Sequence, residues 1–331
     1  MGELQITESS WQELPDMPVK KWESATFLLD DKLYILGGYT ADVKTCKDCH
    51  MFDPADRSWT EIQELPSAIS HVNPVLDGRV AWYAGGFKDG YKDHVVAEVW
   101  NYDIDNDGPA QKGRYTAGPL LPEKRGGGGL ARIGRKLHFI SGLKEDRDTD
   151  AEDHWVMDLD EYAEGRGQWR AEGAPMPTPR NQFSTVEHNG KIYLIGGQFH
   201  HDSCQLDQPN VDIYDSDSDS WSRGPDLPYG HSHSEGGTFI HDDKIYMVGG
   251  HFTREGDHKR IDSDILRLDL NGGEEWELVG QLPVALSSPA SRIISDELFV
   301  AGGSLNGGSV QPKMWVTDAP SRKTSRERPP S

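Results

Sequence analysis

Ionisable side chains stand at alternate positions in one part of the chain, a pattern that could support chemistry. His231, His233 and Glu235 occupy every second position ahead of an apolar run. In an extended strand, residues i, i+2 and i+4 point to the same face, so these three groups would share one. Two imidazoles and a carboxylate could hold a metal ion or transfer protons to and from a bound molecule.

Equivalent positions recur through the chain because six apolar runs each end in a pair of small residues. These pairs are Gly37-Gly38, Gly85-Gly86, Ser141-Gly142, Gly196-Gly197, Gly249-Gly250 and Gly302-Gly303. Counting back an equal distance from each pair gives a first level of Lys21, Arg125, Arg180, His233 and Leu286. Two residues further on, the second level holds Glu23, Gly127, Gln182, Glu235 and Ser288, with Ser70 or, as we favour, His71 from the second unit. The third level holds the small residues Ala25, Gly129, Ser184, Gly237 and Ala290.

The elements that would position these levels are short strands. In the unit from Pro179 to Trp221, strands are expected over 183–187, 191–195 and 211–214, and Trp221 opens a fourth. This is a four-stranded antiparallel meander that cannot bury both of its faces alone. Repetition at a period of about 50 residues therefore predicts an all-β radial array with a central channel.

The repeated Gly-Gly, Tyr-Asp and Trp pattern resembles the Kelch-repeat family over about residues 4–318. The resemblance implies a single-domain, six-bladed β-propeller. The sixth unit stops after its third strand, so the N-terminal stretch 4–14 with Trp11 is expected to complete that blade and close the ring. The expected blades are 20–62, 63–118, 119–172, 173–224, 225–279 and 280–318 plus 4–14, followed by a disordered basic tail at 321–331.

Composition limits the possible partners and location. The chain has 55 acidic and 34 basic residues and a formal charge of −21, which disfavours nucleic acid and anionic membranes. Its three cysteines indicate a reducing compartment, and no signal peptide or membrane span is recognisable. We therefore expect a cytoplasmic protein, and a monomer.

A C-x-x-C-H sequence at Cys46, Cys49 and His50 matches the spacing of a haem attachment site. The match falls where the third strand of the first blade belongs, so we interpret it as part of an ordinary strand. Zinc at the same three residues would lack an evident fourth ligand.

Three functions remain open for the polar levels and for the loops after the small pairs, which add Tyr39, Tyr91, His200, His201, His251 and Arg254 at the same mouth. The first is binding of an anionic ligand or partner, an acidic sugar or peptide. Its ligand-binding residues would be Lys21, Glu23, Arg125, Arg180, Gln182, His233 and Glu235.

The other two functions use the same channel. One is a divalent metal site for Zn, Mn or Fe, with candidate ligands His200, His231, His233, Glu235 and His251. The other is acid/base catalysis on a carbohydrate by a lyase, epimerase or mutarotase, with candidates His71, Tyr91, Arg180, His233 and Glu235. A Kelch-like sialic acid mutarotase of bacteria implies that the family can be enzymatic. The sequence leaves open whether this chain is an enzyme.

Overall fold

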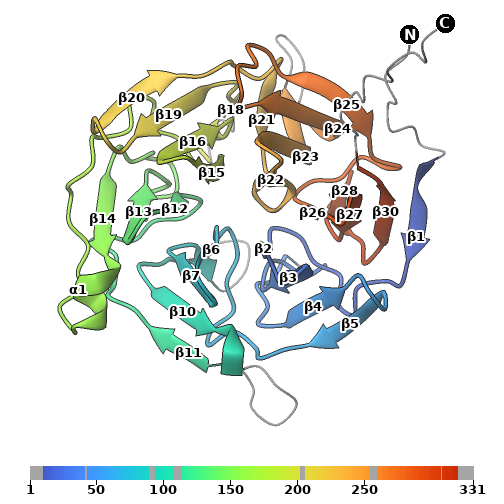
Figure 1. Ribbon diagram of the computed structural model, residues 1–331, viewed down its shortest axis with the longest axis horizontal. Helices are drawn as coiled ribbons and strands as arrows, with labels where there is room; N and C mark the ends of the chain where they lie inside the picture. The colour runs from blue at the N-terminus through green and yellow to red at the C-terminus, as the bar shows by residue number, and fades with distance from the viewer. Residues whose placement is uncertain are drawn as a thin grey trace, which may run out of the picture.

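The computed structural model describes residues 10–41, 43–88, 94–106, 114–201, 206–253, 259–306 and 308–319. Six small sheets stand around a common axis, with the innermost strands β2, β6, β12, β15, β22 and β26 nearest the centre (Figure 1). The predicted six-bladed propeller is confirmed. No helix in these ranges is long and apolar enough to cross a bilayer.

Each blade is an antiparallel meander whose first strand lies innermost. Blade one contains β2 (Ala25–Leu29), β3 (Lys32–Leu36), β4 (Cys49–Asp53) and β5 (Ser58–Glu61), and blade two contains β6 (Val75–Asp77), β7 (Val80–Ala84), β10 (Val99–Asp103) and β11 (Arg114–Ala117). Blade three contains β12 (Gly129–Ile133), β13 (Lys136–Ile140) and β14 (His154–Asp158), and blade four contains β15 (Ser184–His188), β16 (Lys191–Ile195), β19 (Val211–Asp215) and β20 (Ser220–Arg223). Blade five contains β22 (Thr238–His241), β23 (Lys244–Thr253), β24 (Arg260–Asp269) and β25 (Glu277–Gln281), and blade six contains β26 (Ala290–Ile294), β27 (Glu297–Ala301), β30 (Met314–Asp318) and β1 (Gln12–Leu14).

Short strands extend the hairpins at one end of the blades. They are β8 (Phe87–Lys88) with β9 (His94–Val95), β17 (Gln198–Phe199) with β18 (Leu206–Asp207), β28 (Ser304–Leu305) with β29 (Ser309–Val310), and β21 (Gly230–Ser232) with β23. Cys49 and His50 lie in β4, so the C-x-x-C-H match is part of a blade strand.

The ring is closed by pairing the two ends of the chain, as the sequence predicts. β1 lies antiparallel to β30, with Gln12 opposite Val316 and Leu14 opposite Met314. Trp11 Nε1 also donates to the carbonyl oxygen of Gln281 at 2.9 Å. The last blade therefore combines strands from both ends of the chain, and β30 is not left as an open sheet edge.

Blade three departs from the repeat, which predicted a fourth strand after β14. The chain forms a short helix instead, α1 (Leu159–Ala163), whose first turn is capped by the Asp158 carboxylate accepting from the Asp160 and Glu161 amides. Only one bridge, between Arg170 and Val156, remains of the expected strand pairing.

The outer aromatics tie each blade to the segment that enters it. In every blade, the aromatic side chain donates to a backbone carbonyl of that segment. The bonds are Trp59 to Pro15, Tyr115 to Gln63, Trp169 to Pro119, Trp221 to Ala174, Trp276 to Pro225 and Trp11 to Gln281.

The small-residue pairs join the blades near the axis. The amide of the second glycine donates to a backbone oxygen of the next blade, for example Gly38 to Ile69 at 2.9 Å, and the ring closes with Gly303 to Lys21 at 3.0 Å. Gly38 has φ +97, and a Cβ there would lie 2.5 Å from the Trp22 oxygen. Glycine is therefore required at this contact.

Candidate functional site

Six equivalent residues, one per blade, form a ring at the channel, and all have a left-handed backbone. They are Glu23, His71, Gly127, Gln182, His233 and Ser288, with φ of 51, 55, 58, 50, 58 and 48°. Each directly follows a residue that bridges to the one after the small pair, as Trp22 does to Tyr39. Non-glycine residues rarely adopt this conformation, and strained backbone of this kind is concentrated at functional sites. We call these six residues the left-handed ring.

The left-handed ring shows that the levels predicted for the residues of blade five were wrong. Ser232 pairs with His251, so the ring residue is His233, and His231 stands at the level of Lys21, Arg125 and Arg180. Ala25 stands two positions after Glu23, whereas Gly237, the equivalent of Ala25, stands four positions after His233. Counting at constant length therefore misplaced His233 and Glu235.

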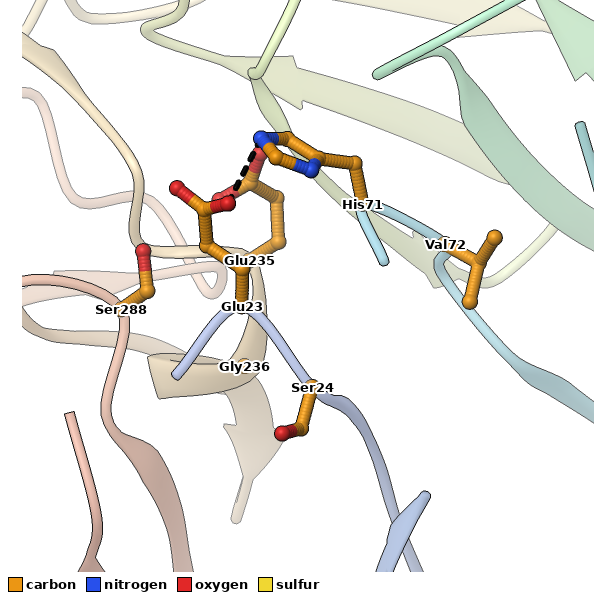
Figure 2. A pocket seen from close by; sticks show the side chains of 7 residues that line it. All are labelled: Glu23, Ser24, His71, Val72, Glu235, Gly236 and Ser288. Atoms are coloured by element: carbon orange, nitrogen blue, oxygen red, sulfur yellow. Dashed lines mark ion pairs between the residues drawn. The ribbon is translucent and has the colours of Figure 1, made fainter. Parts of the chain in front are cut away.

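The two additional residues of blade five enter the channel. They belong to a single 3-10 turn, Glu235–Gly237, which precedes β22. The turn brings Glu235 to a small cavity shared with Glu23, His71 and Ser288 (Figure 2). Figure 2 shows the Glu23 and Glu235 side chains both reaching toward the His71 ring. We call this the upper cavity.

A buried pair of a carboxyl group and an imidazole, Glu23 and His71, lines the upper cavity. Glu23 Oε2 lies 2.7 Å from His71 Nε2, and both side chains are almost fully buried. The other oxygen, Oε1, lies 3.7 Å from His233 Nε2. Burial raises the pKa of Glu23 to about 8 and that of Glu235 to about 7. At neutral pH Glu23 thus retains its proton, and Glu235 is poised between its two forms.

The imidazoles around these carboxyls are held in fixed orientations. His71 Nδ1 lies 2.9 Å from Ser70 Oγ, and His233 Nδ1 lies 2.7 Å from Ser232 Oγ. The His233 and His251 ring centroids are 4.2 Å apart. Burial lowers the pKa of His233 well below its usual value and that of His251 to about 3. These two rings are therefore neutral at physiological pH.

Gln182, a member of the left-handed ring, has a buried side-chain amide with neither polar atom hydrogen-bonded within the described part of the protein. Its exposed fraction is 1%, and neither Nε2 nor Oε1 has a partner among the described residues. A buried polar group without a partner costs about 1–3 kcal/mol. A bound molecule offering both a donor and an acceptor would satisfy it.

The predicted basic residues lie inside the blades rather than at the mouth. Lys21 Nζ donates to the Asp48 carbonyl at 2.7 Å, and Arg180 pairs with the equally buried Asp212 at 2.5 Å. Arg125 contacts Glu123 at 2.9 Å and lies over the Trp155 ring. The geometry thus gives these three cations a role in stabilising the blades.

Comparison with known proteins agrees with this architecture. The Kelch motif matches residues 24–66 and 179–228. A Kelch repeat-containing protein of Arabidopsis thaliana is 23% identical over 96% of this chain and 78% of its own. The chain belongs to the Kelch-repeat family.

Other relatives are longer than this Kelch propeller. The Kelch-like protein terF of Aspergillus terreus is 30% identical, and Kelch-like protein 26 of Danio rerio is 27% identical. The matches cover 93% and 82% of this chain but only 57% and 42% of those proteins. The solved structure of YjhT superimposes with a TM-score of 0.71 at 16% identity, covering 92% of this chain and 96% of that one, which shows a shared fold.

The candidate metal ligands of the Kelch propeller do not come together as one set, although the His233 and His251 rings lie side by side. His231 is paired with Asp262 at 3.2 Å, and the half-exposed His200 lies 3.9 Å from Asp148. In the ranges that the structure describes, no group of three or more His, Cys, Asp or Glu side chains is arranged to hold a metal ion. Tyr91 and Arg254 lie outside those ranges.

Two further charged residues whose contacts lead to the left-handed ring were missed by counting from the small pairs. Lys259 Nζ lies 3.1 Å from Asp207 and 2.7 Å from Gln198 Oε1, and Asp207 accepts from Ser232 Oγ at 2.7 Å. This chain of contacts leads to His233, the neighbour of Ser232. Asp207 and Lys259 sit beyond the small pairs at no repeated spacing, so the sequence carries no signal for them.

Proposed function

We propose that this Kelch propeller binds a small anionic, hydroxyl-rich ligand, an acidic sugar, at the mouth of its channel. The observation that carries the proposal is the unpaired, buried amide of Gln182 in the left-handed ring. Amides that both donate and accept are well suited to sugar hydroxyls. The carboxyls of Glu23 and Glu235, which line the upper cavity, add donors when protonated and acceptors when ionised.

The acidic group of the ligand is matched by Lys259. Lys21, Arg125 and Arg180 are engaged in the blades. Among the described residues, Lys259, which is paired with Asp207, interacts electrostatically with both Glu23 and Glu235. Burial lowers the pKa of Lys259, partly offset by Asp207. An anion bound beside it would favour its charged form. An acidic side chain of a protein partner would offer the same carboxylate to Lys259, so an acidic peptide is included among the probes.

Ligand-observed NMR tests the proposal with glucuronic acid, N-acetylneuraminic acid, glucose and an oligoglutamate peptide as probes. We expect an acidic sugar to bind the wild type and at least a tenfold loss of affinity in Gln182→Ala. Gln63→Ala is the matched control, because Gln63 lies in the linker ahead of blade two. Absence of binding by both acidic sugars, or equal binding by the Gln182 variant, would refute the sugar site. Binding by the peptide alone would favour a protein partner.

A second candidate, acid/base catalysis on the same sugar, is favoured by one specific observation. Two adjacent carboxyls have pKa values of about 8 and 7, raised by burial, and proton-transfer groups work best near the ambient pH. We propose that Glu23 and Glu235 would exchange protons with a sugar hydroxyl. One-dimensional NMR of anomer exchange in a freshly dissolved acidic sugar tests this: Glu235→Gln should abolish any acceleration that the wild type gives.

A further inference from the structure

A second cavity lies on the other side of the blade-five turn, deeper along the channel. It is lined by polar groups from several blades, among them Thr26, Asn73, Thr185, Thr238 and Arg292. It shares Ser24, Val72, Glu235 and Gly236 with the upper cavity. We call it the lower cavity. None of the residues predicted to bind a ligand lines it except Glu235.

Arg292 occupies a position that is apolar in the other blades. It lies on β26 opposite Phe299, and the residues in the same register elsewhere are Phe27, Val75, Ala131, Val186 and Phe239. The guanidinium stacks near the Phe239 ring, 5.6 Å from its centroid. A charge where the five equivalent positions are apolar calls for a reason specific to blade six.

The guanidinium makes only neutral contacts. Nη1 donates to the carbonyls of Gly236 at 2.9 Å and Ser291 at 2.6 Å, and Nη2 donates to that of Thr26 at 2.6 Å. These three bonds leave two of its five N–H donors without a protein acceptor. Across the described residues, Arg292 forms no ion pair.

An unneutralised cation inside a protein is energetically costly, and arginine does not relieve the cost by losing its proton. Burial alone lowers the pKa of Arg292, to about 10, and no carboxylate raises it. The group is therefore charged at neutral pH in a chain whose net charge is −21. A carboxylate from the protein itself could have paired with it, yet the fold supplies carbonyls.

A second group in the same cavity also lacks a partner. The hydroxyl of Thr185, on the innermost strand of blade four, is buried without a hydrogen bond. A cation with spare donors and a free hydroxyl donor are the groups that bind oxyanions. We propose that the lower cavity is a binding site for a small oxyanion, a carboxylate or a tetrahedral inorganic anion, held by Arg292 with Thr185.

The blade-five turn contributes to this site independently of the sugar site. Its Gly236 carbonyl is one of the three acceptors that hold Arg292. A Cβ on Gly236 would lie 2.9 Å from the Pro289 oxygen and 3.3 Å from Thr26 Oγ1, so this position has no room for a side chain. The turn therefore separates the two cavities and fixes the cation in the lower one.

Isothermal titration calorimetry on the whole protein at constant ionic strength tests the proposal, with acetate, inorganic phosphate and selenate as probes. We expect one anion class to bind, with at least a tenfold weaker affinity in Arg292→Gln and a several-fold weaker one in Thr185→Val. Arg132→Gln is the matched control, since Arg132 also lies on an innermost strand and donates to a carbonyl, that of Leu76. Selenate soaked into crystals should give an anomalous peak beside Arg292.

The outcomes separate the possible ligands. Acetate binding identifies a carboxylate site, and phosphate or selenate binding identifies an inorganic oxyanion site. No heat with any probe, or an affinity that Arg292→Gln and Thr185→Val leave unchanged, would overturn the proposal. If Arg292→Gln does not fold, Thr185→Val and the position of the selenate peak still decide. Sugar binding in the upper cavity is measured separately, so its failure would leave this result standing.

Discussion

At the scale of single residues, Glu23 is the buried carboxyl of the channel mouth that lies between His71 and His233. Its folded-state pKa of about 8 exceeds the ordinary value of 4.5, because burial penalises the carboxylate. The folded state therefore holds a proton that the unfolded state releases above pH 4.5. The stability that this proton contributes is complete below pH 4.5 and is lost as the pH rises through 8.

The first prediction follows from that sign. Between pH 5 and pH 9, the free energy of unfolding of the wild type should fall relative to that of Glu23→Gln, which cannot ionise, by at least about 1 kcal/mol. Urea unfolding at both pH values measures it. Glu13→Gln, on the exposed face of β1, should behave like the wild type. A pH dependence shared by all three proteins would contradict the assignment.

The second prediction concerns Arg180, whose role the structure places in the fold. Arg180→Met would leave Asp212 buried without its close partner, which costs about 3–5 kcal/mol. Arg223→Met removes the other, half-exposed partner of Asp212, 3.4 Å away, and should cost no more than about 1 kcal/mol. Chemical denaturation measures the free energy of unfolding of both variants. Equal losses would show that the buried Arg180–Asp212 pair stabilises the fold no more than the half-exposed contact with Arg223.

At the scale of elements, the turn Glu235–Gly237 distinguishes blade five from the other blades. Deleting Glu235 and Gly236 restores the spacing seen between Glu23 and Ala25. We predict a folded protein with an unchanged far-UV circular dichroism spectrum and no affinity for acidic sugars, because the upper cavity loses Glu235. An unfolded product would mean that the turn is required by the fold, whereas retained binding would place the ligand elsewhere.

The same turn marks the limit of what could be predicted from the sequence. Strand order, the small pairs and the outer aromatics follow from local pattern, so the propeller and its closure could be predicted. In blade five the counting assigned His233 and Glu235 to the wrong levels, because this blade has two additional residues and no sequence pattern marks the insertion. The direction of Lys21, Arg125 and Arg180 also escaped prediction: the residue two positions after each has a left-handed backbone, and simple strand alternation does not hold there. His71 and Gln182 were placed correctly, since their blades keep the common length.

At the scale of the whole molecule, stability depends on closing the ring. β1 contributes one outer strand, the buried Leu14 and the Trp11 bond to Gln281. We predict that deleting residues 1–14 lowers the melting temperature by roughly 10 °C or more, since burial of one leucine alone contributes about 1.5–3 kcal/mol. Deleting 321–331, the tail expected from sequence to be disordered, should leave it unchanged. Equal melting temperatures for the two truncations would contradict the closure argument.

The central claim is that burial raises the pKa values of two carboxyls at the channel mouth toward neutral pH. Carbon-13 NMR of protein labelled at the glutamate carboxyls measures this directly across pH 4–10. We predict two resonances with midpoints near 8 and 7, the first lost in Glu23→Gln and the second in Glu235→Gln. Titration of every glutamate below pH 5.5 would contradict the account.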